Sequence, residues 1–504
     1  MDASQQLKQD VREGRIDVDR LVDVIVTLQR QLEAARQEIE ELKKKLGGPT
    51  VKTDEAFSMR AEEKRQEKRG PKKHKLSKKG RRGRLSNVDK LKLAERTEKC
   101  FPDGVPHKDC WLSHTRPVWC LEKGRAVLLA YEIYRGPNNQ YGTIPGVLGR
   151  SEFSLEIMVQ IAYFVYVIGL SFDKVCQILQ FMQHLRLGKT QVDGLLRQLS
   201  RHWQHEFDVL CSLLANSLVV HADETSWSIN SVWALVSEKA RLLFFGVHKD
   251  AETLEQILDP RTFLGLVISD DAAVYANFTQ AQKCWAHLLR KAIKLTLQES
   301  DNAEYRTFTD RLLEIYREAC RVQRDKRLSA AGRQKKVAVL KGDILVLCAP
   351  LWMLELPPLE EGPENDYRLL VNEVMRIMLD EQLFTFVTAE PAAQPNGVSQ
   401  PVSGTNNEGE RTLRGTAAAR DAGRTSKTIV GARRRTIIVS VLESLRLYLA
   451  TFTLASIIAE IKRWRQAGQS CFSELLETLN LAPPQPSSAS MPSILDKVLP
   501  VPDG

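Results

Sequence analysis

The sequence predicts an α/β protein with a mixed sheet, because two short apolar runs each end in carboxylates. Residues 217–220 lead into a segment that contains Asp223, and residues 263–269 lead into Asp270 and Asp271. Short runs rich in β-branched residues are typical of buried strands. A carboxylate at the end of such a strand is costly to bury unless it is paired or binds a metal ion. The two runs therefore predict a sheet with acids at one edge.

Three segments between the two runs predict how the sheet is ordered. Residues 231–240 and 241–248 are expected to form strands joined by a tight turn, and residues 250–258 are expected to form a helix. The order strand, strand, strand, helix, strand allows the two acidic strand ends to be neighbours in one sheet. Paired carboxylates in this arrangement are what phosphoryl transfer with two metal ions requires.

Four short motifs in the chain resemble those of the transposases of the insertion sequence 66 family. They are His-Ala-Asp-Glu-Thr at 221–225, Ser-Asp-Asp-Ala-Ala-Val-Tyr at 269–275, Lys-Cys-Trp-Ala-His-Leu at 283–288 and Asn-Asn-Glu-Gly-Glu-Arg at 406–411. The resemblance extends from about residue 20 to about residue 470. It implies the ribonuclease-H-like core of DDE transposases, with a helical insertion between the second acid and the third.

The implied chemistry is DNA cleavage and strand transfer supported by two Mg²⁺ ions, for which Mn²⁺ can substitute. Carboxylates are the hard oxygen ligands that hold such ions. Asp223 is expected to bridge both ions, and strand alternation favours it over the adjacent Glu224. The resemblance places the second acid five positions before a tyrosine, so Tyr275 selects Asp270. Asp271 stays open as the alternative, because alternation alone does not fix the register.

The third acid is expected on a helix packed against the sheet. The family pattern Asn-Asn-x-x-Glu-Arg maps onto Asn406, Asn407, Glu410 and Arg411, which makes Glu410 the third catalytic and metal-binding acid. Glu408 is the runner-up, and it also suits a first-turn position that the helix dipole favours. Asn407 is a further candidate site residue.

The segment around the third acid also carries candidate DNA contacts. Its arginines predict a DNA-facing surface, with a merely solvated basic helix as the alternative. These arginines are Arg411, Arg414, Arg420, Arg424, Arg433, Arg434 and Arg435. His287 follows an expected strand at 283–285 and is either a group beside the scissile phosphate or a capping or packing histidine.

The overall composition is that of a globular protein with polyanionic partners. The 504 residues suffice for two to four domains, with 43% hydrophobic and 27% charged residues and a net charge of +9. Nine cysteines without framework spacing favour a reducing compartment. The first residues predict no signal peptide, and the longest apolar stretch, 157–170, is too short to span a bilayer. We expect a cytoplasmic, nucleoid-associated bacterial protein.

The N-terminal segment, residues 1–48, is expected to form a coiled coil. Its apolar residues alternate in steps of four and three, which is typical of a heptad seam, whereas a single amphipathic helix on the main body is the alternative. We therefore expect a homo-oligomer. The seam consists of Leu21, Ile25, Leu28, Leu32, Ala35, Ile39, Leu42 and Leu46.

A basic linker, residues 49–95, follows the heptad seam. Such a segment cannot bury a core and is expected to be disordered when free, serving either as a solvated linker or as an arm that contacts DNA phosphates. We favour phosphate contact. The expected contacts are Lys72, Lys73, Lys75, Lys78, Lys79, Arg81, Arg82 and Arg84.

A cysteine- and histidine-containing region, 96–150, comes next. Family members often carry a zinc module here, but Cys100, Cys110 and Cys120 are each separated by nine residues. Structural zinc sites usually have close ligand pairs, so zinc is not expected. We interpret the region as a degenerate module held by tryptophans and a strand around 127–129.

The remaining segments follow from helical spacing and turn residues. A helix-turn-helix-like pair around Gly188 is weak evidence for DNA binding, because many helical domains contain such a pair. The expected parts are a helical region at 151–212, a catalytic core at 213–290 and 406–440, a helical insertion and loop at 291–405, C-terminal helices at 441–480, and a disordered tail at 481–504.

The sequence thus predicts a transposase that cuts at the ends of its mobile element and joins them to target DNA, with accessory proteins as further candidate partners. One alternative is a structure-specific nuclease on the same fold, which would cleave without joining. Another is a DNA-binding relic that has lost its chemistry, although the complete set of three acids argues against it.

Overall fold

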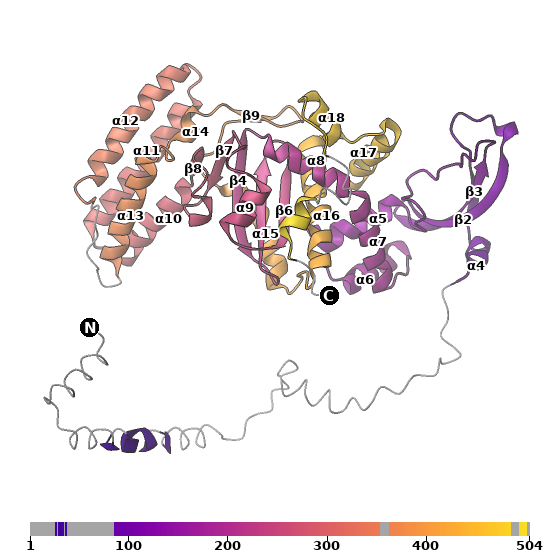
Figure 1. Ribbon diagram of the computed structural model, residues 1–504, viewed down its shortest axis with the longest axis horizontal. Helices are drawn as coiled ribbons and strands as arrows, with labels where there is room; N and C mark the ends of the chain where they lie inside the picture. The colour runs from indigo at the N-terminus through magenta and orange to yellow at the C-terminus, as the bar shows by residue number, and fades with distance from the viewer. Residues whose placement is uncertain are drawn as a thin grey trace, which may run out of the picture. The chain divides into compact units, whose positions relative to one another are not determined.

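The chain forms two compact units, Met1–Arg84 and Leu85–Gly504. This computed structural model describes residues 26–27, 29–34, 36–37, 85–352, 362–484 and 493–500 (Figure 1). In the first unit, the described residues are helical and exposed, and they include one heptad position, Leu32. The rest of the expected seam and the basic residues at 64–84 lie outside the described part of the chain.

The second unit begins with a small sheet that has its own apolar core. After helix α4 (Asn87–Lys92), strands β1 (Arg96–Cys100), β2 (Trp111–Glu122) and β3 (Arg125–Arg135) pair in the order β1-β3-β2. Val118, Leu129 and Ile133 are buried between them. The three cysteines have different surroundings. Cys100 is buried in this core, and the Cys110 thiol donates a hydrogen bond to the Pro106 carbonyl. Cys120 lies 3.7 Å from the Tyr131 hydroxyl.

Four helices connect the small sheet to the central one. Ser171 begins α6 by accepting a hydrogen bond from the Lys174 backbone, and buried residues on α7, such as Val192, Leu196 and Leu199, repeat at helical spacing. The helices are α5 (Leu155–Ala162), α6 (Phe172–Gln183), α7 (Lys189–His202) and α8 (Gln204–Ala215), with a π-helical turn, Tyr163–Val167, after α5.

The central sheet has five strands in the order β6-β5-β4-β7-β8. β4, β5 and β6 pair antiparallel, whereas β4 with β7 and β7 with β8 pair parallel. The expected mixed α/β sheet is therefore confirmed, and its order is compatible with a ribonuclease-H-like core. The elements are β4 (Val219–Ser226), β5 (Ser231–Ser237), β6 (Arg241–Val247), α9 (Ala251–Ile257), β7 (Leu266–Ser269) and β8 (Ala281–Lys283).

Helix α16 (Ile429–Tyr448) covers the β6 edge of the sheet (Figure 1). Three hydroxyls spaced four residues apart on α16 accept hydrogen bonds from alternate backbone N–H groups of β6. The pairs are Thr436 with Phe245 at 2.9 Å, Ser440 with Leu243 at 3.0 Å, and Ser444 with Arg241 at 2.9 Å. An unpaired strand edge would otherwise leave these donors buried without partners. The expected domain boundary at 440–441 is wrong, because this one helix runs through it.

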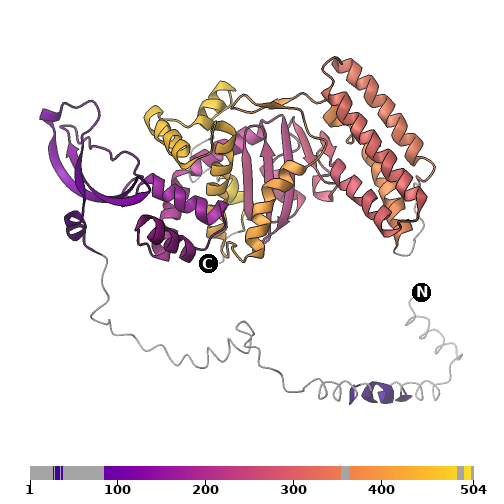
Figure 2. The same ribbon diagram turned by 180° about the vertical axis from the view of Figure 1, so that it is seen from behind.

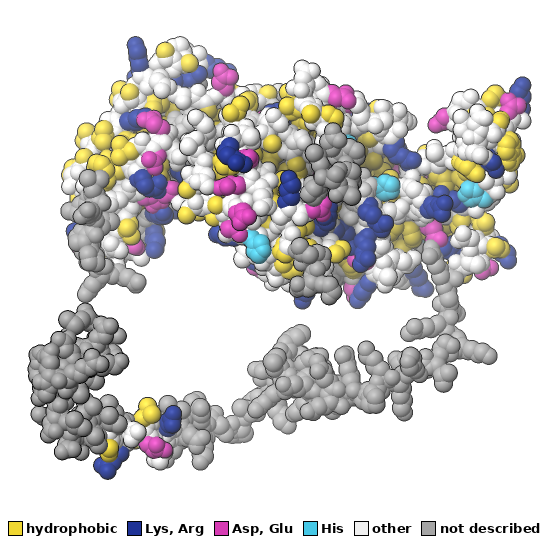
Figure 3. All heavy atoms as spheres, in the orientation of Figure 1, with side chains coloured by type: hydrophobic (Ala, Val, Ile, Leu, Met, Phe, Trp, Pro, Cys, Tyr) yellow, Lys and Arg dark blue, Asp and Glu magenta, His cyan; other side chains and the backbone are white. Residues whose placement is uncertain are grey.

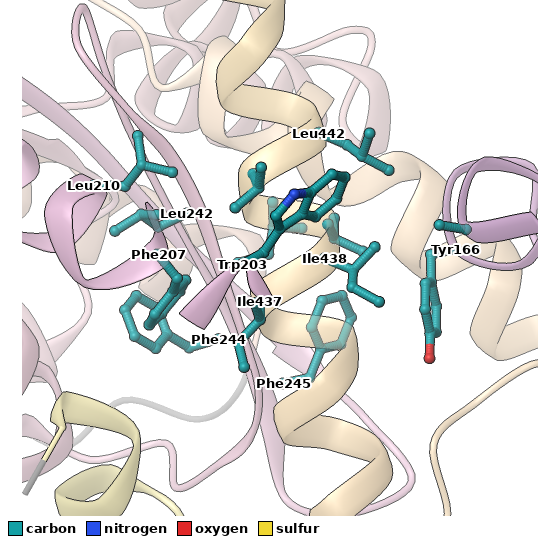
Figure 4. Close-up of a cluster of buried hydrophobic side chains, with 14 of the residues drawn as sticks. Tyr166, Trp203, Phe207, Leu210, Leu242, Phe244, Phe245, Ile437, Ile438 and Leu442 are labelled. Atoms are coloured by element: carbon teal, nitrogen blue, oxygen red, sulfur yellow. The ribbon is translucent and has the colours of Figure 1, made fainter. Parts of the chain in front are cut away.

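Apolar side chains from β6, α8 and α16 fill the space beneath this helix. Figure 4 shows Phe244 and Phe245 of the strand packed with Phe207 of α8 and with Ile437 and Ile438 of α16. All five side chains are at most 3% exposed. This cluster fixes the half of the sheet that lies away from the acids.

A helical bundle lies between β8 and the segment of the third acid. Figure 2 shows its long helices side by side at one side of the central sheet. The helices are α10 (Trp285–Gln298), α11 (Ala303–Arg324), α12 (Ala330–Cys348), α13 (Pro363–Leu379) and the short α14 (Thr385–Thr388). The expected strand at 283–285 is wrong beyond Lys283, because Cys284 is the N-cap of α10 and Trp285 begins it. The helical spacing of buried Trp285, Leu288 and Leu289 explains the difference.

The last part of the chain returns to the central sheet. Two short strands, β9 (Ala392–Ala393) and β10 (Ser399–Gln400), precede α15 (Asn407–Asp421), and α17 (Leu454–Ala467) and α18 (Cys471–Thr478) follow α16. The tail is not wholly irregular as expected, since Ile494–Val498 forms helix α19 with Leu495 buried in the main core. None of the described helices is long and apolar enough to cross a membrane.

Candidate active site

Asp223 lies on the face of β4 that packs against α15. A Cβ atom added at Gly409 of α15 would lie 3.1 Å from the Asp223 Cβ, so a larger residue there would push the helix and the strand apart. Two residues further along β4, Thr225 accepts a hydrogen bond from Arg420 of the same helix at 3.0 Å. Because alternate strand residues share a face, both contacts assign Asp223 to the α15 side.

The adjacent Glu224 points to the opposite face and is neutralised there. Tyr275 donates a hydrogen bond to its carboxylate at 2.5 Å, and Lys249 forms an ion pair with it at 2.8 Å. Its side chain is only 4% exposed. The structure therefore separates the two neighbouring acids of β4.

Asp270 follows β7 beside Asp223. The parallel ladder between β4 and β7 ends at the pair His221 and Ile268, and its register continued by two residues sets Asp270 against Asp223. The charge of Asp270 accordingly acts on Asp223. The backbone carbonyl of Asp270 accepts a hydrogen bond from Lys283 of β8 at 3.2 Å. The Ala272 backbone donates to the Asp270 carboxylate at 3.1 Å.

Asp271, the alternative second acid, has a different partner. Its carboxylate forms an ion pair with Arg376 of helix α13 in the insertion. A cleft of about 750 Å³ opens beside both aspartates. Lys283, His287 and Lys291 contribute to its lining.

The N-terminus of α15 is anchored to β4 by Asn406. This side chain is fully buried, and its amide donates to the Ala222 carbonyl at 2.7 Å. Its backbone N–H points to the Cys284 sulfur at 3.1 Å. The candidate Asn407, by contrast, is exposed. The residue that anchors the helix is therefore Asn406, which the sequence indicated only as part of the motif at 406–411.

The two glutamates at the start of α15 have different environments. Glu410 receives a hydrogen bond from Arg290 of α10 at 2.5 Å, and the His287 ring lies 3.9 Å from its carboxylate. Glu408 instead pairs with Arg241 of β6 and with Arg411, each at 2.7 Å. Glu410 thus lies toward the insertion and the acidic end of β7, and Glu408 lies toward β6.

Asp223 is the candidate acid whose surroundings most disfavour its charge. Burial, together with the nearby charges of Glu224, Asp270 and Glu410, raises the pKa of Asp223 to about 7. The backbone of Glu224 donates to Asp223 at 3.0 Å and opposes part of this rise. Three carboxylates supply the oxygen donors that Mg²⁺ and Mn²⁺ prefer.

Residues 150–349 match the family model described as Transposase IS66 family. This segment belongs to that family. The match includes β4, β7 and β8, and therefore Asp223 and Asp270, whereas α15 with Glu410 lies beyond it. Family membership implies transposition and DNA binding. No curated protein matches the chain.

The candidate DNA-facing arginines around α15 and α16 have different surroundings. Arg411 and Arg414 are exposed on α15. The expectation that Arg434 and Arg435 face DNA is wrong. Arg434 pairs with Asp193 at 2.6 Å, and Arg435 is 3% exposed with its guanidinium 4.8 Å from the centre of the Trp227 ring.

The described surface has no single basic patch on the face that Figure 3 shows. Lys and Arg side chains are spread over this face and interleaved with Asp and Glu.

Arg433, the third arginine of the run 433–435, pairs with Asp496 of α19. The sequence signal of three consecutive arginines therefore reflects packing between α16 and its neighbours.

Proposed function

We propose that the protein is a transposase that cleaves DNA at the ends of an insertion sequence and joins the resulting 3′-hydroxyl to target DNA. The observation that supports this most is that the charges of Asp270, at the end of β7, and of Glu410, on α15, both act on the buried Asp223 of β4. Burial and these neighbouring charges raise the pKa of Asp223, so a cation beside its carboxylate would be favoured.

Asp223, Asp270 and Glu410 would hold the divalent ions. Two such ions supply charge stabilisation at the attacking and leaving oxygens of an in-line displacement. Within the chain, Asn406 and Gly409 bring α15 against β4, and Lys283 fixes the backbone that carries Asp270. Arg290 balances the charge of Glu410 while no cation is bound.

DNA contacts would come from two sources. Arg411 and Arg414 are exposed on the helix that carries Glu410, so they suit phosphates near the reacting strand. The basic residues at 64–84 would add sequence-independent contacts that weaken as salt rises. A pair of chains joined through the heptad seam would bring two such arms to the two ends of the element.

A strand-transfer assay with Mg²⁺ and the DNA that flanks this gene tests the proposal. The wild-type protein is expected to cleave and join, whereas Asp223→Asn binds the same DNA without cleaving it. Glu410→Gln is expected to behave like Asp223→Asn, and Glu408→Gln is its matched control with activity retained.

Each other outcome contradicts a defined part of the proposal. Cleavage without joining would indicate a structure-specific nuclease on the same fold. DNA binding by the wild-type protein without any cleavage in Mg²⁺ or Mn²⁺ would indicate an inactive relic. Loss of activity in Glu408→Gln but not in Glu410→Gln would reverse the assignment of the third acid.

A further inference from the structure

A second group of metal-ligand side chains lies beside the three acids. The ligand atoms of Cys284, His287 and Glu410 all lie within 4.8 Å of one another. Among the described residues, this is the one group of at least three His, Cys, Asp or Glu side chains with such spacing. The set differs chemically from the three acids, because it contains a sulfur and an imidazole nitrogen.

The sulfur is held by backbone donors at the start of α10. Cys284 is the N-cap of this helix and is 2% exposed. The backbone N–H group of Asn406 donates to its sulfur at 3.1 Å, and those of Ala286 and His287 also favour its charged form. Burial still raises the pKa of the thiol, so a cation that binds here displaces its proton to solvent. The N–H groups would then stabilise the thiolate ligand.

The imidazole is available for a cation. The Nδ1 atom of His287 is buried and has no hydrogen-bond partner, and its Nε2 atom lies 3.9 Å from Glu410. A buried ring nitrogen without a partner is costly, and a ligand at this position would satisfy it. Arg290 is the group that now faces the Glu410 carboxylate, and its side chain is 56% exposed, so it can turn into solvent.

We propose that Cys284, His287 and Glu410 form a second cation site that takes a thiophilic ion such as Zn²⁺ and shares Glu410 with the three-acid site. Thiolate and imidazole ligands select Zn²⁺ over Mg²⁺, and three protein ligands leave a fourth position open. An ion in this site withdraws Glu410 from Asp223 and Asp270. Zinc is therefore an inhibitor of the Mg²⁺-dependent reaction, a consequence that rests on the proposed function.

Titration of the metal-free full-length protein with Co²⁺ tests the site without any activity measurement. Cobalt bound to a thiolate gives a charge-transfer absorption, and one equivalent per chain is expected to produce it. Cys284→Ser is expected to remove the absorption. His287→Gln is expected to weaken Co²⁺ binding by more than the roughly 10- to 100-fold that loss of an outer hydrogen-bond partner costs.

Control variants separate this site from other cysteines and from the three acids. Cys110→Ser and Cys348→Ser are expected to keep the absorption. Asp223→Asn is expected to keep it too, so the site remains testable even if the protein proves inactive as a transposase. Absence of the absorption in the wild type, or its full retention in both Cys284→Ser and His287→Gln, would overturn the proposal. Circular dichroism verifies that each variant is folded, and the more exposed His287 is the second test if Cys284→Ser does not fold.

Discussion

Acids that are neighbours in the sequence have opposite surroundings at the end of the central sheet. Glu224 and Asp271 are neutralised by protein cations, Lys249 and Arg376 respectively. In the described part of the chain, the carboxylates of Asp223 and Asp270 pair with no Lys, Arg or His side chain. We conclude that an acid paired with a protein cation at this edge of the sheet stabilises the fold. An acid without such a partner is a candidate ligand for a bound metal cation.

The same contrast separates the two glutamates of α15. Glu408 is held by Arg241 and Arg411, and it links the helix to β6. Glu410 has one partially exposed partner, Arg290, which a cation can replace. Pairs of adjacent or nearby acids therefore offer matched variants in which the same chemical change has different expected effects.

The largest difference is expected between Asp270→Asn and Asp271→Asn. Loss of a metal ligand removes several kcal/mol of transition-state stabilisation, so Asp270→Asn should lower the cleavage rate by at least about 10³-fold. Asp271→Asn breaks an ion pair that is partly exposed and should change the rate less than about tenfold. Single-turnover cleavage in Mg²⁺ measures both. Equal losses in the two variants would remove the distinction between them.

Two glycines of α15 test how closely this helix must approach Asp223. Gly409→Ala places a methyl group 2.9 Å from the Asn406 side-chain oxygen and 3.1 Å from the Asp223 Cβ, so the helix must shift. We expect it to destabilise the protein by about 1–3 kcal/mol and to impair cleavage. Gly415→Ala meets nothing within 4 Å and should stabilise it by roughly 0.5–1 kcal/mol. Chemical denaturation compares the two, and similar effects would argue against the close contact.

The raised pKa of Asp223 predicts a pH effect in the metal-free protein. Because the folded-state pKa of about 7 exceeds the ordinary value of 3.8, the folded state binds more protons between these values. The free energy of unfolding should therefore fall as pH rises from about 4 to about 7. The stability of Asp223→Asn should not fall in this way. Its free energy of unfolding at pH 8 in the presence of a chelator should therefore exceed that of the wild type by an amount on the order of 1–3 kcal/mol.

Thermal denaturation at pH 5 and pH 8 measures this difference. Glu224→Gln should lose stability at both pH values because it removes the ion pair with Lys249, and it should also reduce the difference between pH 5 and pH 8 because it removes a charge that raises the pKa of Asp223. Addition of Mg²⁺ should stabilise the wild type at pH 8 and have less effect on Asp223→Asn. A wild-type protein whose stability is flat over this pH range would contradict the raised pKa.

Deletion of residues 1–47 is expected to have the smallest effect on metal binding by the three acids. These residues belong to the first compact unit, so Mg²⁺ binding by the second unit should not change. The deletion should lower the oligomer mass and the yield of paired-end complexes, because two linked arms bind DNA with higher avidity than one. Light scattering and a paired-end joining assay measure this. An unchanged mass with undiminished joining would exclude the heptad seam as the pairing element.

Much of the central sheet was predictable because its signals are local. Apolar runs predicted β4 and β7, and turn residues predicted the β5–β6 pair. Period-two alternation assigned Asp223 and Glu224 to different faces. The choice between Asp270 and Asp271 as a neighbour of Asp223 needed the parallel register of β4 and β7, because a shift of one residue exchanges the two faces.

Other features were missed because local patterns carry no information about distant partners. Arg435 has the positive charge expected of a DNA contact, but it packs against Trp227, which is more than 200 positions away in the sequence. Cys284 continued an apolar strand pattern, yet it caps a helix. The hydroxyl ladder of α16 looked like ordinary polar residues on a helix, and its role depends on the unpaired edge of β6.

By itself, the sequence determined the order of strands and helix along the chain, the candidate acids and the resemblance to a transposase family, since these follow from periodicity and short motifs. Only the tertiary structure decided which acids have protein partners, and that Asn406 and Gly409 hold α15 against β4. It also brought Cys284 and His287 within reach of Glu410, across more than 120 residues. The physical reason is that burial, charge pairing and close approach depend on distances in space, which sequence spacing does not specify.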